Sequence, residues 1–250
     1  MTEFRPGRFQ ILPTVIKNLI IINVLVFLAQ LAVGDSFNFE TRFALHTWQS
    51  PYFRIWQFFT YMFLHANWPH IIFNMLALWM FGSTLENLWG PKRFLTFYIA
   101  CGLGAALCNM LVVYIQTQAM LSQFDTITSE SALRAFMDKY NHYPELPFTL
   151  DGARTALAYN LNTGTLGASG AVFGCLAAFG YLFPNDYIYL YFSIPVKAKW
   201  VVLGYIGVEL FLQIKSSPGD NIAHLAHLGG ALIGFLLAYF WNKNNRRRVY

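Results

Sequence analysis

The sequence predicts an all-α polytopic membrane protein with six membrane-spanning helices and an extended outer loop between the third and the fourth. Three observations support this prediction. Only 12% of the 250 residues are charged, whereas soluble domains average about 25%. The apolar residues are gathered into six long runs. Basic residues flank these runs, as they do at membrane boundaries, so the net charge of +5 indicates lipid and not nucleic acid as the partner.

The six apolar runs are the candidate spans. They are Thr14–Val33, Pro69–Leu88, Phe94–Ile115, Ala168–Phe183, Trp200–Ile214 and Ile222–Trp241. A span needs about 20 residues, so we expect the short fourth and fifth runs to be sheltered partly by protein. The first run is too long for the apolar region of a signal peptide and lacks a cleavage site, so we expect it to be retained as a span.

The basic residues also set the expected orientation. With the N-terminus in the cytoplasm, most of the 17 lysines and arginines lie on the inner side, as the positive-inside rule requires. The C-terminus is then also cytoplasmic, with a basic tail over residues 242–250. The chain is expected to form one domain, residues 1–250, with its membrane core at about 14–241.

The segment between the third and fourth runs is an insertion of about 116–166 on the outer side. Within it, Ser129–Tyr140 predicts a short amphipathic helix with Glu130 in its first turn. Pro144 and Pro147 should then break the helical pattern. None of the polar residues singled out in the spans lies in this insertion.

Ionisable and polar residues inside spans are costly, so each needs a reason. His70 and Asn74 are four residues apart on one helix face, at the outer start of the second span. Ser169 stands at the outer start of the fourth. His227 lies about five residues into the sixth, or roughly 7–8 Å deep. Shared depth favours a common site over scattered interhelical hydrogen bonds.

Small residues predict how two of these groups meet. Gly170 and Gly174 on the fourth span, and Gly230 and Gly234 on the sixth, are spaced for close helix packing in lipid. Such packing would bring the Ser169 hydroxyl within hydrogen-bond reach of an imidazole, about 2.6–3.2 Å.

This combination predicts nucleophilic catalysis. A serine hydroxyl needs a base, for which histidine has a suitable pKa. Backbone N–H groups at the helix start, with His70 and Asn74, could form an oxyanion hole. We expect no carboxylate beside His227, and therefore a Ser–His dyad with Phe173 packed under the imidazole in place of an acid. Glu209 is expected near mid-membrane, protonated or paired within the bundle.

Four motifs carry a family resemblance. They are GASG at Gly167–Gly170, HIIFN at His70–Asn74, AHLAHLGGALIG at Ala223–Gly234, and FPND…IPVKAKW at Phe183–Trp200. In this order and on alternate spans, they resemble the rhomboid intramembrane serine proteases. The resemblance covers roughly residues 14–241 and implies a six-helix rhomboid-like bundle.

The resemblance also implies roles for single residues. Ser169 would be the nucleophile and His227 the general base, whereas His224 stands where the family does not place the base. His70, Asn74 and the Ser169 backbone would supply the oxyanion donors. No cofactor or metal is implied. Transmembrane proteins are the implied substrates, and the bacterial cytoplasmic (inner) membrane is the implied location of a multi-pass protein.

Three alternatives compete with this interpretation. The main alternative is a catalytically inactive rhomboid-like protein that binds or escorts membrane clients, although such a protein would normally lack the serine or the base. A metalloprotease using His65, His70, His224 and His227 would need an H-E-x-x-H helix, which is missing. The three cysteines have no zinc spacing. A small transporter would be favoured by paired broken helices in two repeated halves, which the sequence lacks.

Overall fold

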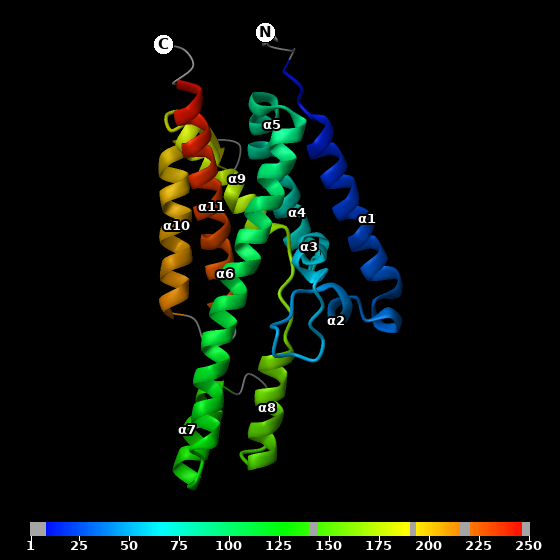
Figure 1. The fold of residues 1–250 in the computed structure, drawn as a ribbon, viewed down its shortest axis with the longest axis vertical. Helices are drawn as coiled ribbons and strands as arrows, with labels where there is room; N and C mark the ends of the chain where they lie inside the picture. Colours follow the sequence, from blue (N-terminus) through cyan, green and yellow to red (C-terminus); the bar gives the residue numbers. More distant parts are fainter. Residues whose placement is uncertain (1–8, 141–144, 191–193, 216–220, 247–250) are drawn as a thin grey trace.

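The structure is a computed structural model that describes residues 9–140, 145–190, 194–215 and 221–246. Its centre is formed by α6 (Pro91–Asp125), α9 (Ser169–Leu182) and α11 (Asn221–Arg246), which pack side by side. Helix α10 (Ala198–Lys215) lies on one flank of this group, and α1 (Thr14–Phe37) lies at the other edge of the bundle (Figure 1).

The second predicted span is one bent rod made of three pieces. It begins with α4 (Trp68–Ala77), continues through a π-helical turn, η2 (Leu78–Gly82), and ends with α5 (Ser83–Trp89). Asn67 caps its start, because Oδ1 of this residue accepts the backbone N–H of His70 at 2.9 Å. The cap fixes the first turn of α4, which carries His70.

Four described helices are long and apolar enough to cross a membrane. They cover Thr14–Gly34, Trp68–Trp89, Pro91–Asp125 and His224–Lys243. The chain is therefore an integral membrane protein, while the number of six spans stays a prediction. Helix α9 has only 14 residues, and ten of them are buried. This burial confirms the expectation that protein shelters the short fourth run.

The insertion forms a small helical layer of its own. Helix α6 continues to Asp125, beyond the predicted Ile115, and α7 (Glu130–Tyr140) confirms the amphipathic helix. A further helix, α8 (Leu150–Asn162), was not predicted. Apolar side chains from these helices form a second cluster, consisting of Met120, Phe136, Met137, Tyr140 and Ala153. Pro144 lies outside the described residues.

The arrangement of the chain ends agrees with the predicted topology. Helix α1 begins and α11 ends at the same end of the bundle, whereas α7 and α8 lie at the opposite end (Figure 1). The insertion and the basic flanks are thus on opposite sides.

The segment between α1 and α4 is held together by one buried side chain. It contains α2 (Phe39–Phe43), α3 (Gln57–Thr60) and a 3₁₀ turn, η1 (Tyr61–Phe63). Gln57 is fully buried. Its Nε2 donates to the Tyr52 carbonyl at 2.9 Å, and its Oε1 accepts from the backbone N–H of Arg54 at 3.1 Å. A polar side chain satisfied in this way can be buried without a large cost.

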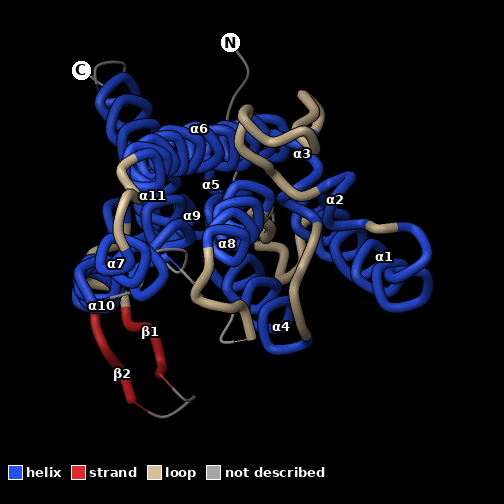
Figure 2. The backbone as a smooth tube through the Cα atoms, turned by 90° about the horizontal axis from the view of Figure 1, so that it is seen from below, coloured by secondary structure: helices blue, strands red, loops and turns tan. Residues whose placement is uncertain are grey.

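The all-α prediction is wrong at one place. The linker after α9 forms an antiparallel hairpin of β1 (Tyr187–Leu190) and β2 (Ile194–Lys197), which pairs Tyr187 with Lys197. Tyr, Ile and Val favour extended backbone. Figure 2 shows the hairpin projecting from the bundle beside α10.

Close packing of α9 against α11 depends on glycine. A methyl group on Gly230 would overlap the carbonyl oxygen of Gly170, and one on Gly234 would overlap that of Gly174. The two backbones therefore touch along the predicted stripe, which confirms the packing expected from the spacing of small residues.

Candidate active site

Ser169 is the first residue of α9, and the chain leading to it is firmly tied. Thr165 pairs with Leu45 through two backbone hydrogen bonds of 2.8 and 2.9 Å. The N–H of Gly167 then donates to the carbonyl oxygen of Tyr61 at 2.9 Å. Gly167 has a φ of 130°, which a side chain would make strained. This glycine turns the chain into the helix and so places the serine.

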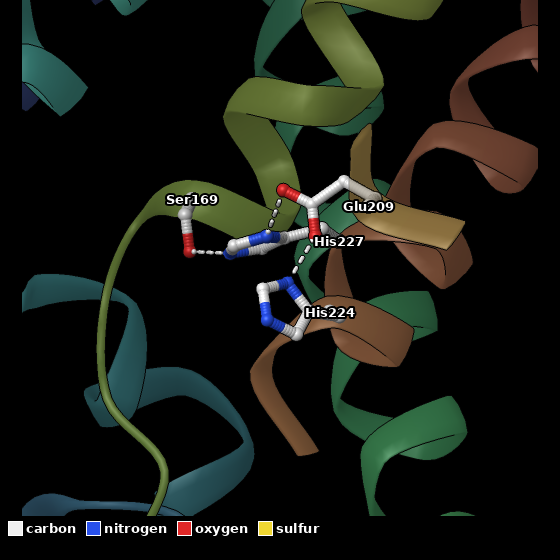
Figure 3. Close-up of polar contacts among 4 residues, drawn as sticks. All are labelled: Ser169, Glu209, His224 and His227. Carbon is white, nitrogen blue, oxygen red and sulfur yellow. Dashed lines mark hydrogen bonds and ion pairs between the residues drawn. The ribbon is translucent and has the colours of Figure 1, made fainter. Parts of the chain in front are cut away.

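His227 comes from α11 and faces Ser169 directly. Its Nε2 lies 2.7 Å from Oγ of Ser169 (Figure 3). The Phe173 ring, one turn after the serine on α9, stacks on the imidazole with centroids 4.4 Å apart and planes 5° apart. Glycine packing sets the distance between the helices, and the phenylalanine fixes the plane of the ring.

The expectation that no carboxylate lies beside His227 is wrong. Glu209 on α10 reaches into the same layer, with Oε1 3.1 Å from Nδ1 of His227. Its other oxygen, Oε2, lies 2.6 Å from Nδ1 of His224. Figure 3 shows one carboxyl oxygen contacting each of the two rings, with Ser169 at the other nitrogen of His227. Phe173 therefore stacks on the imidazole in addition to an acid and not in place of one.

The contacts with His224 and His227 confirm the expectation that Glu209 is paired within the bundle. Glu209 as a whole is 7% exposed, and a buried carboxylate needs hydrogen-bond donors. Each oxygen faces one imidazole Nδ1. An N–H on both Nδ1 atoms would satisfy the carboxylate and leave Nε2 of His227 as an acceptor for the Ser169 hydroxyl.

Glu209, His224 and His227 could together be considered as metal ligands. Each offers one potential ligand atom, and these atoms lie within 4.8 Å of one another. The hydrogen bonds within this group already use the carboxylate oxygens and both Nδ1 atoms. We therefore interpret it as a hydrogen-bonded array and not as a metal centre.

His70 and Asn74 lie on α4, across from the serine. A Cβ placed on Gly167 would lie 2.9 Å from Nε2 of His70 and 3.5 Å from Oγ of Ser169. Because Gly167 has no side chain, this position beside Nε2 of His70 and Oγ of Ser169 stays open. Asn74 is 7% exposed, and its Nδ2 donates to the His70 carbonyl at 2.9 Å. Its second amide hydrogen remains for another acceptor.

The four histidines of the metalloprotease alternative divide into two pairs. His65 and His70 have ring centroids 5.0 Å apart, while His224 and His227 belong to the array with Glu209. His65 lies just before α4 and is almost fully buried. Burial, with a smaller contribution from His70, lowers the pKa of His65 to about 4.

Together these features define an integral membrane protein with a serine–histidine pair held inside its helical bundle. The chain belongs to the rhomboid family, because the rhomboid domain model matches residues 52–123 and 147–244. The two matched segments leave out residues 124–146, which contain α7.

Curated relatives support the same family. The chain is 31% identical over 180 residues, 72% of its length, to RHOMBOID-like protein 12, mitochondrial, from Arabidopsis thaliana, and it covers 44% of that protein. It is 24% identical over 234 residues to Rhomboid protease GluP of Bacillus subtilis, covering 90% of this chain and 34% of GluP. For Rhomboid protease AarA of Providencia stuartii the identity is 26%, with coverages of 73% and 54%. The chain thus spans between a third and about half of these relatives.

Proposed function

We propose that this chain is an intramembrane serine endopeptidase that cleaves membrane proteins in or near their transmembrane segments. The observation that carries the proposal is the 2.7 Å contact between Nε2 of His227 and Oγ of Ser169. Similarity to proteins named as rhomboid proteases, GluP and AarA, supports it at the level of the family.

The chemistry would proceed by acyl transfer. Nε2 of His227 takes the hydroxyl proton while Oγ of Ser169 bonds to the substrate carbonyl carbon, giving a tetrahedral intermediate. His227 then passes that proton to the leaving amine as the C–N bond breaks. Water, deprotonated by the same nitrogen, cleaves the acyl-enzyme and restores the serine.

The developing oxyanion would be stabilised from two sides. The backbone N–H of Ser169 lies at the start of α9, where amide groups have no intrahelical partner. Nε2 of His70 borders the open point beside Gly167, and Asn74, which donates to the His70 carbonyl one turn along α4, is the second proposed donor. Donors aimed at a developing negative charge are worth most where water is excluded.

The proposed substrates are single transmembrane helices. Amides within a helix are hydrogen-bonded and shielded, so the substrate must unwind locally before attack. Ser169 stands at the start of α9, which is the end of that helix nearer to α7 and α8 (Figure 1). We propose that this end faces the outer side, which would supply the water, with both termini in the cytoplasm. For the location, we propose a bacterial cytoplasmic membrane, although curated relatives are named as mitochondrial as well as bacterial.

A serine-reactive fluorophosphonate probe tests the proposal. We expect the purified protein to be labelled at Ser169, and to cleave a reporter transmembrane substrate. Ser169→Ala and His227→Ala should each abolish cleavage, and the double variant should lose little more, because nucleophile and base act as a unit. A folded wild-type protein that neither labels nor cleaves would favour the alternative of an inactive client-binding rhomboid-like protein.

A further inference from the structure

Glu209 is a buried acidic group whose surroundings point to the active site. It lies on α10, and its side chain is 9% exposed. A carboxyl group at membrane depth is costly unless it is paired. Here both oxygens are used, one on His227 and one on His224.

We infer that Glu209 is a positioning residue for the general base, so that the site is a Ser169–His227–Glu209 triad in which His224 holds the carboxylate. This inference rests on the proposed protease function and assigns a role within the same site. The order of the groups supports it, because the serine and the carboxylate contact opposite nitrogens of one imidazole.

The carboxylate would act through the position of a proton. A neutral imidazole carries one N–H, and only the nitrogen without it can accept a proton from serine. An acceptor at Nδ1 of His227 keeps the N–H there and leaves Nε2 free to act as the base. When Nε2 takes the serine proton, the adjacent negative charge stabilises the resulting imidazolium.

His224 explains why the carboxylate stays in place. Its Nδ1 lies closer to Glu209 than that of His227 does, 2.6 Å against 3.1 Å. The second donor satisfies the oxygen that does not serve the base, so the carboxyl group needs no water. The His224 ring also lies edge-on to that of His227, with centroids 6.5 Å apart, and its hydrogen bond to Glu209 assigns it the role of holding the carboxylate.

Two substitutions separate orientation from charge. Glu209→Gln removes the charge, but its amide oxygen still accepts from His227 while its N–H₂ group faces His224, whose ring then carries its proton on Nε2. Glu209→Met removes both charge and acceptor at similar length. Val208→Met is the matched control, because it places the same side chain one residue earlier, at a position that is 53% exposed.

The measurements are kcat and KM on a reporter transmembrane substrate in detergent. In triad proteases, loss of the correct tautomer lowers kcat about 10⁴-fold. Without an acceptor at Nδ1 the tautomer is no longer fixed, so we expect Glu209→Met to lower kcat about 100- to 10⁴-fold, and Glu209→Gln, whose amide oxygen can still accept from Nδ1, about tenfold, with KM unchanged. Val208→Met should behave as wild type. A kcat of Glu209→Met within twofold of wild type would overturn the inference.

A spectroscopic measurement keeps the test decisive if Glu209→Met does not fold. In protein labelled with ¹⁵N-histidine, we expect the resting His227 ring to be protonated on Nδ1 and bare on Nε2. Protonation on Nε2 in the wild-type protein would refute the triad whatever the variants do. Failure of the proposed protease function looks different, because then the wild-type protein and Ser169→Ala are equally inactive.

Discussion

The contact between α9 and α11 makes a sharp prediction for Gly230→Ala. The added methyl group would run into the Gly170 carbonyl oxygen, which belongs to the backbone and cannot rotate away. The helices must therefore separate to accept it. Ser169 precedes Gly170 on one helix, and His227 stands one turn from Gly230 on the other, so the separation acts directly on the catalytic pair.

The size of the effect follows from the geometry. Relieving the overlap with the Gly170 carbonyl requires a shift of about 1.5–2 Å, given contact distances of about 3.5–4.0 Å between carbon atoms. Such a shift takes the 2.7 Å contact between Ser169 and His227 beyond the range of a hydrogen bond. Misplacement by 1 Å costs about 10² in rate, and overpacking costs about 1–3 kcal/mol in stability. We expect both losses together.

The assay is the rate of fluorophosphonate labelling at Ser169, read beside the thermal unfolding midpoint. Gly204→Ala on α10 is the control, because a methyl group there meets nothing within 4 Å. It should label as fast as wild type. Equal labelling rates for Gly230→Ala and Gly204→Ala, at equal stability, would show that close backbone contact does not set the catalytic distance.

Four further predictions test other parts of the site. Asn74→Ala should lower kcat about 10²–10³-fold with KM nearly unchanged, since one oxyanion donor is lost; a raised KM with normal kcat would instead make Asn74 a binding residue. Deleting about 120–160 should leave Ser169 reactive, because Thr165 keeps its bonds to Leu45 and doubling a loop costs only about 0.6 kcal/mol; loss of labelling in a folded deletion would contradict this. Cleavage in detergent should survive strong chelators, whereas loss with EDTA that zinc restores would refute the serine mechanism. Burial lowers the pKa of His65 from 6.5 to about 4 in the folded protein, so between these pH values mainly the unfolded state takes up the proton. The free energy of unfolding should therefore fall by about 2–3 kcal/mol as the pH drops from 6.5 to 4. A melting-temperature profile just as steep in His65→Gln would exclude this histidine as the cause.

The features that the sequence predicts well are those carried by local patterns. Apolar runs mark the spans because lipid admits few charges, and the spacing of Gly170, Gly174, Gly230 and Gly234 marks a close helix contact because small residues recur on one face. The amphipathic α7 is equally local, since its apolar side chains recur along one side. Four of the predicted spans, the close helix contact and α7 are confirmed by the structure.

The two missed elements carry only weak local patterns in the sequence. Helix α8 has weak helical patterning, and it is stabilised by packing Ala153 into a cluster with Phe136 and Met137 on α7. The hairpin of β1 and β2 is only four residues per strand. In the sequence, its few apolar residues do not distinguish it from an irregular linker between two spans. Propensity is a weak guide where such tertiary contacts decide.

The depth assigned to Glu209 depends on the end of the span from which it is counted. Counted from the inner end of the fifth run, Glu209 falls near mid-membrane, whereas His227 lies near the outer end of the sixth. Helix α10 ends at Lys215, about six residues after Glu209, which places the carboxyl group about 9 Å from the outer end. Helix α11 begins at Asn221, and His227 follows about six residues later, at the same depth of about 9 Å. When adjacent antiparallel helices are joined by a short connection, depths counted from that connection are directly comparable. Counted in this way, a carboxylate and a histidine fall in one layer, and a third partner for the serine becomes the expected arrangement.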